Sequence, residues 1–118
     1  RKHRGWDPDS IENLPLFQGG ISTIEGVELF ELKTTRDMLN LGRQYNNCLR
    51  MHVHRALKGG LLVWEVKDLS TGEGAILGFE KKQDGWHCEE QFFRGVDDKD
   101  VESAYLWQQR SLVERALN

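Results

Sequence analysis

The sequence has few residues that cross-link or stiffen a small protein, with two cysteines and two prolines among 118 residues. Cys48 and Cys88 allow one disulfide at most, and nothing resembles a secretory signal, so we expect free thiols in a reducing compartment. No apolar run approaches the roughly 18 residues that span a bilayer, so no membrane segment is expected. No Cys/His spacing of a zinc site occurs either, and we expect neither a metal nor a cofactor.

Charge is present in both signs but unevenly distributed. The formal net charge of −3 disfavours indiscriminate binding of nucleic acid over the whole surface. Between Arg36 and Lys58, however, five cations stand against the single acid Asp37. From Val96 to Glu102 the balance reverses, with four acids against one lysine. A local basic surface is therefore compatible with the acidic total.

The length and the apolar fraction of 38% fit one folded domain with its own core. We expect residues 1–26 to form an N-terminal extension, whose first part, Arg1–Pro8, is a basic arm that either frays or docks through Trp6. Residues 27–118 are expected to form a single α+β domain. The domain should be an antiparallel meander of three to four strands packed by helices.

Periodicity and capping signals divide the domain into elements. Thr34 and Asp37 make a capping box that opens the first helix, and Asn46-Asn47 opens the second. Asp84-Gly85 is a tight hairpin dipeptide. Asp97 or Asp98 is expected to cap the final helix. The expected elements, in order, are strand 27–32, helix 34–43, helix 46–58, strands 61–67, 75–80 and 86–93, and a helix that ends near residue 116.

Short motifs between residues 27 and 98 suggest a family. A leucine and hydroxylated residues open a helix, a glycine and a cysteine follow, a second helix ends at a glycine before a strand, and a glutamine later precedes a glycine turn. The positions are Leu32, Thr34, Thr35, Asp37, Met38, Gly42, Asn47, Cys48, Gly59, strand 62–68, Gln91 and Gly95. This pattern resembles the PcfJ-like family of conjugative plasmids, phages and other mobile elements. The resemblance implies a mobile-element context and a cytoplasmic location, and no settled activity.

One hypothesis makes the protein an enzyme. A cysteine at a helix start, beside arginines, has its thiolate favoured. A helix bearing the nucleophile, followed by strands that supply a histidine and a polar orienting residue, is similar to papain-like and NlpC-type thiol hydrolases. The candidate catalytic residues are Cys48, His87 as general base, and Glu89 or Gln91 as the orienting residue. The competing interpretation, which we favour, is that Cys48 fills a core position, since cysteine is commonly buried.

A second hypothesis is recognition of nucleic acid. A basic face on the second helix and its approach would meet phosphates, and Tyr45 would supply stacking. The candidate residues are Arg43, Arg50, His54, Arg55 and Lys58. The alternative is a solvated helix face partly neutralised by the acidic segment 97–102. His52 and His54 lie two residues apart, on different helix faces, so a shared metal is not expected.

A third hypothesis is a protein-interaction module that uses a strand edge and exposed tryptophans. Trp64 and Trp86 are expected in the core, which leaves Trp6 and Trp107 as interface candidates. We take as our working expectation a PcfJ-like accessory domain that binds a macromolecular partner, with nucleic acid as the first choice. The thiol hydrolase and the protein-interaction module stand as alternatives.

Overall fold

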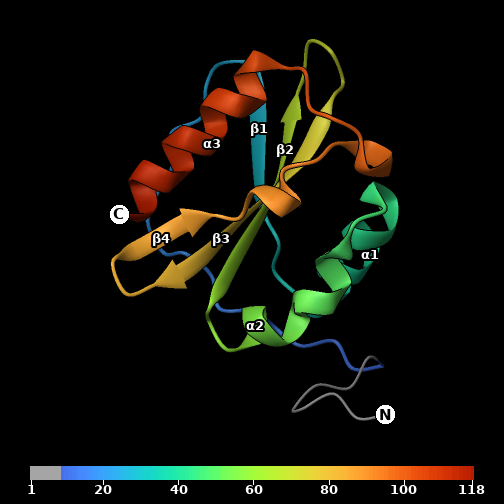
Figure 1. The fold of residues 1–118 in the computed structure, drawn as a ribbon, viewed down its shortest axis with the longest axis vertical. Helices are drawn as coiled ribbons and strands as arrows, with labels where there is room; N and C mark the ends of the chain where they lie inside the picture. Colours follow the sequence, from blue (N-terminus) through green and yellow to red (C-terminus); the bar gives the residue numbers. More distant parts are fainter. Residues whose placement is uncertain (1–8) are drawn as a thin grey trace.

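A four-stranded antiparallel sheet runs through the molecule in the order β1-β2-β3-β4, the meander expected from the sequence (Figure 1). The computed structural model describes residues 9–118, so the expected basic arm Arg1–Pro8 lies outside the described residues. The strands are β1 (Val27–Glu31), β2 (Leu61–Asp68), β3 (Gly74–Lys82) and β4 (Gly85–Cys88). Together with the helices they form an α+β fold.

The helices lie to either side of this sheet in Figure 1, with α1 and α2 to one side and α3 to the other. The longer helices are α1 (Thr35–Tyr45) and α3 (Ala104–Leu117). Between α1 and the sheet's second strand come a 3₁₀ helix, η1 (Cys48–His52), and the short helix α2 (Val53–Leu57). Two further 3₁₀ turns, η2 (Glu90–Phe92) and η3 (Val96–Asp98), connect β4 to α3.

Alternation along β2 creates two hydrophobic clusters, because successive side chains of a strand point to opposite faces. Leu61 and Val63 belong to the cluster that α1, η1 and α2 cover. Leu62 and Trp64 belong to the cluster beneath α3. Both faces of the sheet are thus buried, and the second helical region is fixed from below by a fully buried Leu49.

The start signals at Thr34 and Asn47 act as the sequence predicts. The Thr34 hydroxyl accepts from the Asp37 backbone N–H at 3.3 Å, and the Asp37 carboxylate accepts from the Thr34 N–H at 3.1 Å. The Asn47 side chain accepts from the Leu49 N–H at 2.9 Å. The expected second helix, however, begins as the 3₁₀ turn η1 and becomes α-helical only at Val53.

The last strand is shorter than the sequence predicts. Pairing of β3 with β4 ends at Cys88, and the chain then coils into η2. Strict alternation along a strand 86–93 would put Phe92 on the face of Trp86 and Cys88, which pack with the cluster under α3. The turn instead places Phe92 in the cluster under α1 and Phe93 against the cluster under α3. Glu90, which strict alternation places in the core, has a side chain that is 76% exposed and binds Arg110 at 3.3 Å.

The final helix begins later than predicted, and neither Asp97 nor Asp98 caps it. Both residues adopt positive φ, 58° and 60°, a conformation that aspartate tolerates. Ser103 is the cap instead, since its hydroxyl accepts from the Leu106 N–H at 3.3 Å. The same hydroxyl donates at 2.6 Å to Asp68, which ties the start of α3 to the end of β2.

The described part of the N-terminal extension, residues 9–26, lies against the sheet. Leu14 is buried in the cluster under α1, and its N–H donates to the Lys33 carbonyl at 2.9 Å. Phe17 meets the Trp64 ring edge-on at 6.5 Å.

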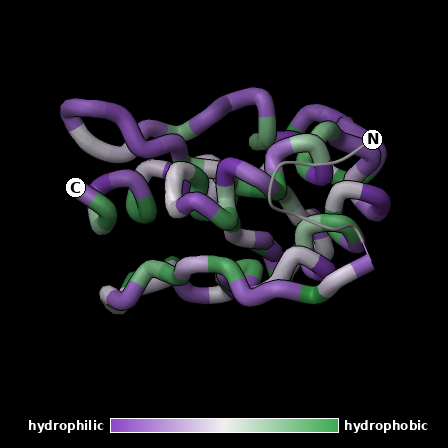
Figure 2. The backbone as a smooth tube through the Cα atoms, turned by 90° about the horizontal axis from the view of Figure 1, so that it is seen from below, coloured by the Kyte–Doolittle hydropathy of each residue, from purple (hydrophilic) through white to green (hydrophobic). Residues whose placement is uncertain are grey.

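Hydrophobic and hydrophilic residues alternate over short stretches of the backbone (Figure 2). Among residues 9–118, no helix is long and apolar enough to cross a membrane.

Candidate functional site

The chain reverses sharply between α1 and η1, and this reversal builds a surface cavity. Asn46 ends α1 in the left-handed conformation, with φ of 53°, and its N–H donates back to the last carbonyls of α1. Gly42 lets η1 approach closely, because a Cβ at this position would stand 3.3 Å from the Arg50 backbone nitrogen. The first turn of η1 therefore lies against the end of α1.

This cavity, which we call the basic notch, has a volume of about 290 Å³. Its lining residues are Leu39, Gly42, Arg43, Asn46, Asn47 and Arg50. Arg43 and Arg50 are both exposed, and neither forms an ion pair with any residue of the described range 9–118. The Asn47 amide nitrogen is buried, and no acceptor for it is present among these residues. The notch thus offers donors and no acid.

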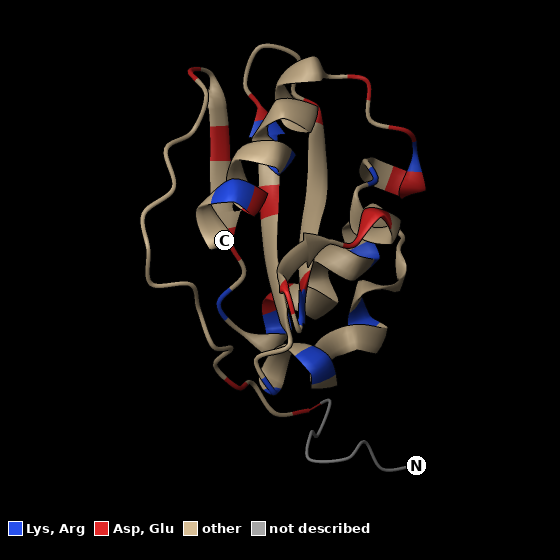
Figure 3. Cartoon of the chain, turned by 60° about the vertical axis from the view of Figure 1, so that its left-hand side comes forward, with Lys and Arg blue, Asp and Glu red and all other residues tan. Residues whose placement is uncertain are grey.

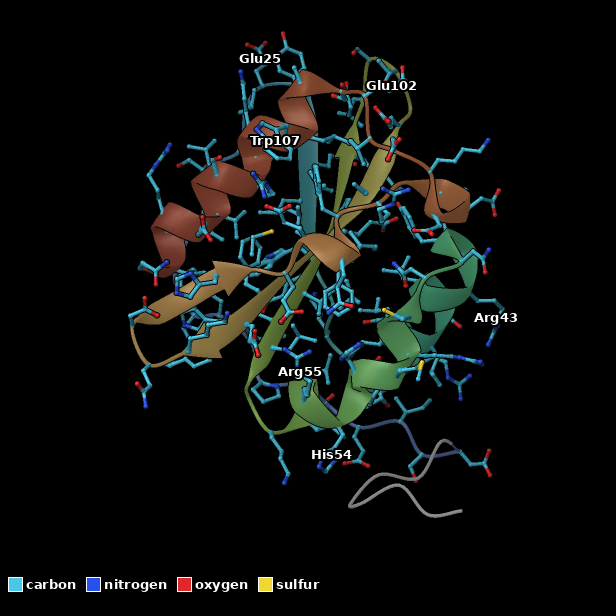
Figure 4. All side chains as sticks on the ribbon, in the orientation of Figure 1. Glu25, Arg43, His54, Arg55, Glu102 and Trp107 are labelled. Carbon is cyan, nitrogen blue, oxygen red and sulfur yellow. The ribbon has the colours of Figure 1, made fainter. Side chains whose placement is uncertain are left out.

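The other predicted cations do not join this notch. Arg55 and His54 project from opposite sides of α2, and Arg43 lies apart from both on α1 (Figure 4). The Arg55 guanidinium binds Glu80 at 3.3 Å and Glu89 at 3.1 Å, so its charge is already paired. Lys58 is exposed at the end of α2. The predicted basic face is therefore divided, with Arg43 and Arg50 as the pair that shares a cavity.

Tyr45 is not available for stacking on a base. Its side chain is 1% exposed, and its hydroxyl donates to Glu65 at 2.7 Å. Burial, together with this hydrogen bond, raises the pKa of Tyr45. The acidic segment after η2 does not neutralise the notch by direct pairing either, because Asp98 and Asp100 both bind Arg94.

Three of the four predicted catalytic residues lie in one hydrogen-bonded chain beside η1. The Cys48 thiol makes a long contact of 3.8 Å with the Gln91 side-chain oxygen. The Gln91 amide nitrogen in turn donates to the Glu89 carboxylate at 2.5 Å. Glu89 also accepts a hydrogen bond from Arg55. The thiol is therefore linked, through the side chains of Gln91 and Glu89, to a charged arginine.

His87, the predicted general base, lies elsewhere. Its Nε2 is 2.7 Å from Asp84 at the β3–β4 hairpin. The histidine near this hydrogen-bonded chain is instead His52, whose Nδ1 is 3.0 Å from an Arg55 nitrogen and whose ring meets Phe92 edge-on at 5.0 Å. We call this group of side chains the thiol cluster: Cys48, His52, Arg55, Glu80, Glu89 and Gln91. Within residues 9–118, no histidine nitrogen hydrogen-bonds the Cys48 sulfur.

The sequence reasoning missed Arg55 and His52 as members of the thiol cluster. Their spacing of three residues places them on one face of a helix, which is a usable signal. The partners of Arg55 are Glu80 near the end of β3 and Glu89 just after β4. No local sequence pattern predicts these pairs, because strand register decides which residues of the sheet lie beside Arg55. Register pairs Glu80 with His87 and brings Glu89 alongside.

The carboxyls of this cluster titrate differently. Burial opposes ionisation of Glu89, but hydrogen bonds from its neighbours hold its pKa down at about 2. The hydrogen bond to Glu89 raises the pKa of Glu80, and burial adds to that shift. Burial lowers the pKa of His52, and the Arg55 charge lowers it further. At neutral pH the cluster therefore holds an ionised Glu89 against Arg55 and a neutral imidazole.

The remaining predicted features fall as follows. Trp64 is buried and Trp86 is partly buried, whereas Trp107 is 49% exposed on α3 with the Arg110 guanidinium 3.5 Å above its ring. Trp6 lies outside the described residues. In the described part of the chain, no group of three histidine, cysteine, aspartate or glutamate side chains is placed to hold a metal ion.

Comparisons with known proteins add no relative: no family model, no curated protein and no solved structure matches this chain. The site is therefore interpreted from its own geometry.

Proposed function

We propose that the chain is a PcfJ-like accessory domain of a mobile element or phage that binds nucleic acid through the basic notch, in the cytoplasm. The observation that carries the proposal is the notch itself, where Arg43 and Arg50 share a cavity without a carboxylate partner in the described chain. The guanidinium group presents forked donors that match phosphate oxygens, so an unpaired couple of arginines suits a nucleic-acid backbone.

The distribution of charge supports the same proposal. In Figure 4, Glu25 and Glu102 are labelled at the end of the molecule opposite to His54 and Arg55. Lys and Arg segments occur on the lower helices of Figure 3, where Asp and Glu segments are also present. With a net charge of −3, a polyanion is attracted only where cations exceed acids locally, as in the lining of the notch.

Several residues that carry the resemblance to the PcfJ-like family lie near the notch. Gly42 and Asn47 line the notch, and Cys48 follows directly. Gln91, from a motif more than forty positions away in the sequence, contacts the Cys48 thiol. Motif residues that meet in space are typical of a shared site, and the notch borders it.

Charge reversal tests the proposal. The Arg43→Glu/Arg50→Glu variant should lose most binding of a labelled oligonucleotide, measured by fluorescence anisotropy at low salt. Lys99→Glu/Arg115→Glu is the matched control, since it changes the net charge equally at exposed residues that make no ion pair in the described chain. Equal weakening by both variants would show that total charge matters and the notch does not. Absence of any binding by the wild-type protein would remove the proposal.

A thiol-dependent hydrolase is the second candidate, and the chain from Cys48 through Gln91 to Glu89 is the observation in its favour. Its weakness is the base, because the Nδ1 of His52 faces Arg55 rather than the thiol. Burial raises the pKa of Cys88 to about 11, which makes this second thiol an internal reference for low reactivity. A hydrolase requires iodoacetamide to label Cys48 well before Cys88 near neutral pH. Equal, slow labelling of both thiols in the folded protein would eliminate this candidate.

A further inference from the structure

We infer that the basic notch holds a single phosphate group, bound by the guanidinium groups of Arg43 and Arg50 and by the side-chain amide of Asn47. The inference rests on the proposed function and specifies which part of a nucleic acid the notch receives. The ligand chemistry is a phosphate oxyanion, whether a phosphodiester within a strand or a phosphate at its end.

The dimensions of the notch fit a group of this size. Its volume of about 290 Å³ lies just below the roughly 300–1,000 Å³ of pockets that enclose whole drug-sized ligands. A water molecule takes about 30 Å³ of liquid, so a phosphate and part of its hydration shell fit with room to spare. The notch therefore suits one anionic group of a longer ligand.

Asn47 contributes a donor whose orientation is fixed. Its Oδ1 accepts from the Leu49 backbone N–H at 2.9 Å. This bond fixes the orientation of the amide, so that Nδ2 points away from the Leu49 N–H. Its Nδ2 is buried and has no acceptor in the described chain. An unpaired buried donor is unfavourable, and most such groups in native proteins find a partner. A phosphate oxygen drawn between the two arginines supplies the missing acceptor.

The lining of the notch contains no group that would repel an anion. None of the six lining residues is acidic. Gly42 keeps the wall of the notch free of a side chain at the point where η1 meets α1. Leu49, fully buried beneath, holds the backbone of η1 in place. The lining thus contains two arginines and one oriented amide, and no carboxylate.

The test is a titration of ¹⁵N-labelled protein with inorganic phosphate, followed by NMR. The side-chain NH₂ signals of Asn47 and the Nε signals of Arg43 and Arg50 should shift together and saturate. Asn47→Asp keeps the cap on Leu49 but replaces the donor by an acceptor, so it should weaken phosphate binding at least tenfold. Asn40→Asp is the matched control, because Asn40 is exposed on α1 outside the notch. Arg50→Gln, at an exposed position, provides a second variant with no cap to lose.

The outcomes separate the inference from the proposed function. If phosphate shifts these signals but no oligonucleotide binds, the phosphate site stands and the nucleic-acid proposal fails. If oligonucleotide binding requires Arg43 and Arg50 but Asn47→Asp and Arg50→Gln leave phosphate binding unchanged, the inference fails. Shifts spread evenly over other cations would also overturn it. Equal affinity for oligonucleotides with and without a terminal phosphate assigns the notch to backbone phosphates, and a requirement for the terminal group assigns it to strand ends.

Discussion

Replacing Gly78 by alanine should destabilise the fold by about 1–3 kcal/mol, the usual cost of an extra methyl group in a packed core. A Cβ on Gly78 would stand 2.5 Å from Cδ2 of Phe92, well inside van der Waals contact. The Phe92 ring is fully buried and packed edge-on against His52, so it has no open direction in which to move. The strain falls on η2, the turn that carries Gln91 toward the thiol of Cys48.

Urea unfolding followed by tryptophan fluorescence measures this cost, with an unchanged m-value as the sign that the unfolded state is the same. Leucine at position 92 is smaller than phenylalanine and relieves the clash with the new methyl group. The destabilisation of Gly78→Ala/Phe92→Leu should therefore be about 1 kcal/mol less than the sum for the two single changes. A Gly78→Ala protein within about 0.5 kcal/mol of wild type, or a strictly additive double variant, would refute the packing described for β3 and η2.

Three other changes test the fold around the site. Thr34→Ala breaks the capping box with Asp37 and should lower the free energy of unfolding by about 1 kcal/mol, whereas Thr34→Ser should retain most of it. Tyr45→Phe leaves Glu65 without its buried donor and should cost about 1–3 kcal/mol; no loss in urea unfolding would contradict the bond. Burial lowers the pKa of His52, so the unfolded chain binds this proton more tightly and stability should fall as pH drops below about 6.5 and level off below the folded pKa. The drop should be smaller in His52→Gln, and an identical pH profile would contradict it.

Most of the fold follows from local signals in the sequence. The order of strands and helices, the capping box at Thr34 and the Asn47 cap depend on residues within four positions of one another, and all agree with the structure. The second helical region carries apolar residues at helical spacing, and three of them, Leu49, Val53 and Ala56, lie in the core. Local hydrogen bonds and periodicity act over these short distances, so the sequence alone reveals them.

The errors arise where distant contacts decide the local structure. Strict alternation predicts a strand through Phe93, but the backbone N–H of Glu89 binds the Gly78 carbonyl and the chain then coils, so that Phe92 fills the space beside a glycine. Ser103 displaces the aspartates as the cap of α3, since Asp68 on β2 holds its hydroxyl. Neither partner is near in the sequence.

The candidate site divides in the same way. The sequence identifies Cys48, Gln91 and Glu89 as possible partners, and the structure joins them by hydrogen bonds. The sequence also suggests a basic face, but helical spacing does not reveal that Arg55 forms salt bridges with Glu80 and Glu89. The notch depends on the reversal at Asn46, which no periodic pattern predicts.

The most direct test of the central claim is the salt dependence of oligonucleotide binding by wild-type protein and by Arg43→Gln/Arg50→Gln. Each phosphate contact contributes a slope of about −0.7 for single strands or −0.9 for duplex in a plot of log K against log salt concentration. Because both arginines are inferred to contact one phosphate, their loss should flatten the slope by about 0.7 or 0.9 and weaken binding at low salt. A slope and an affinity that the double variant leaves unchanged would contradict the assignment of nucleic-acid binding to the basic notch.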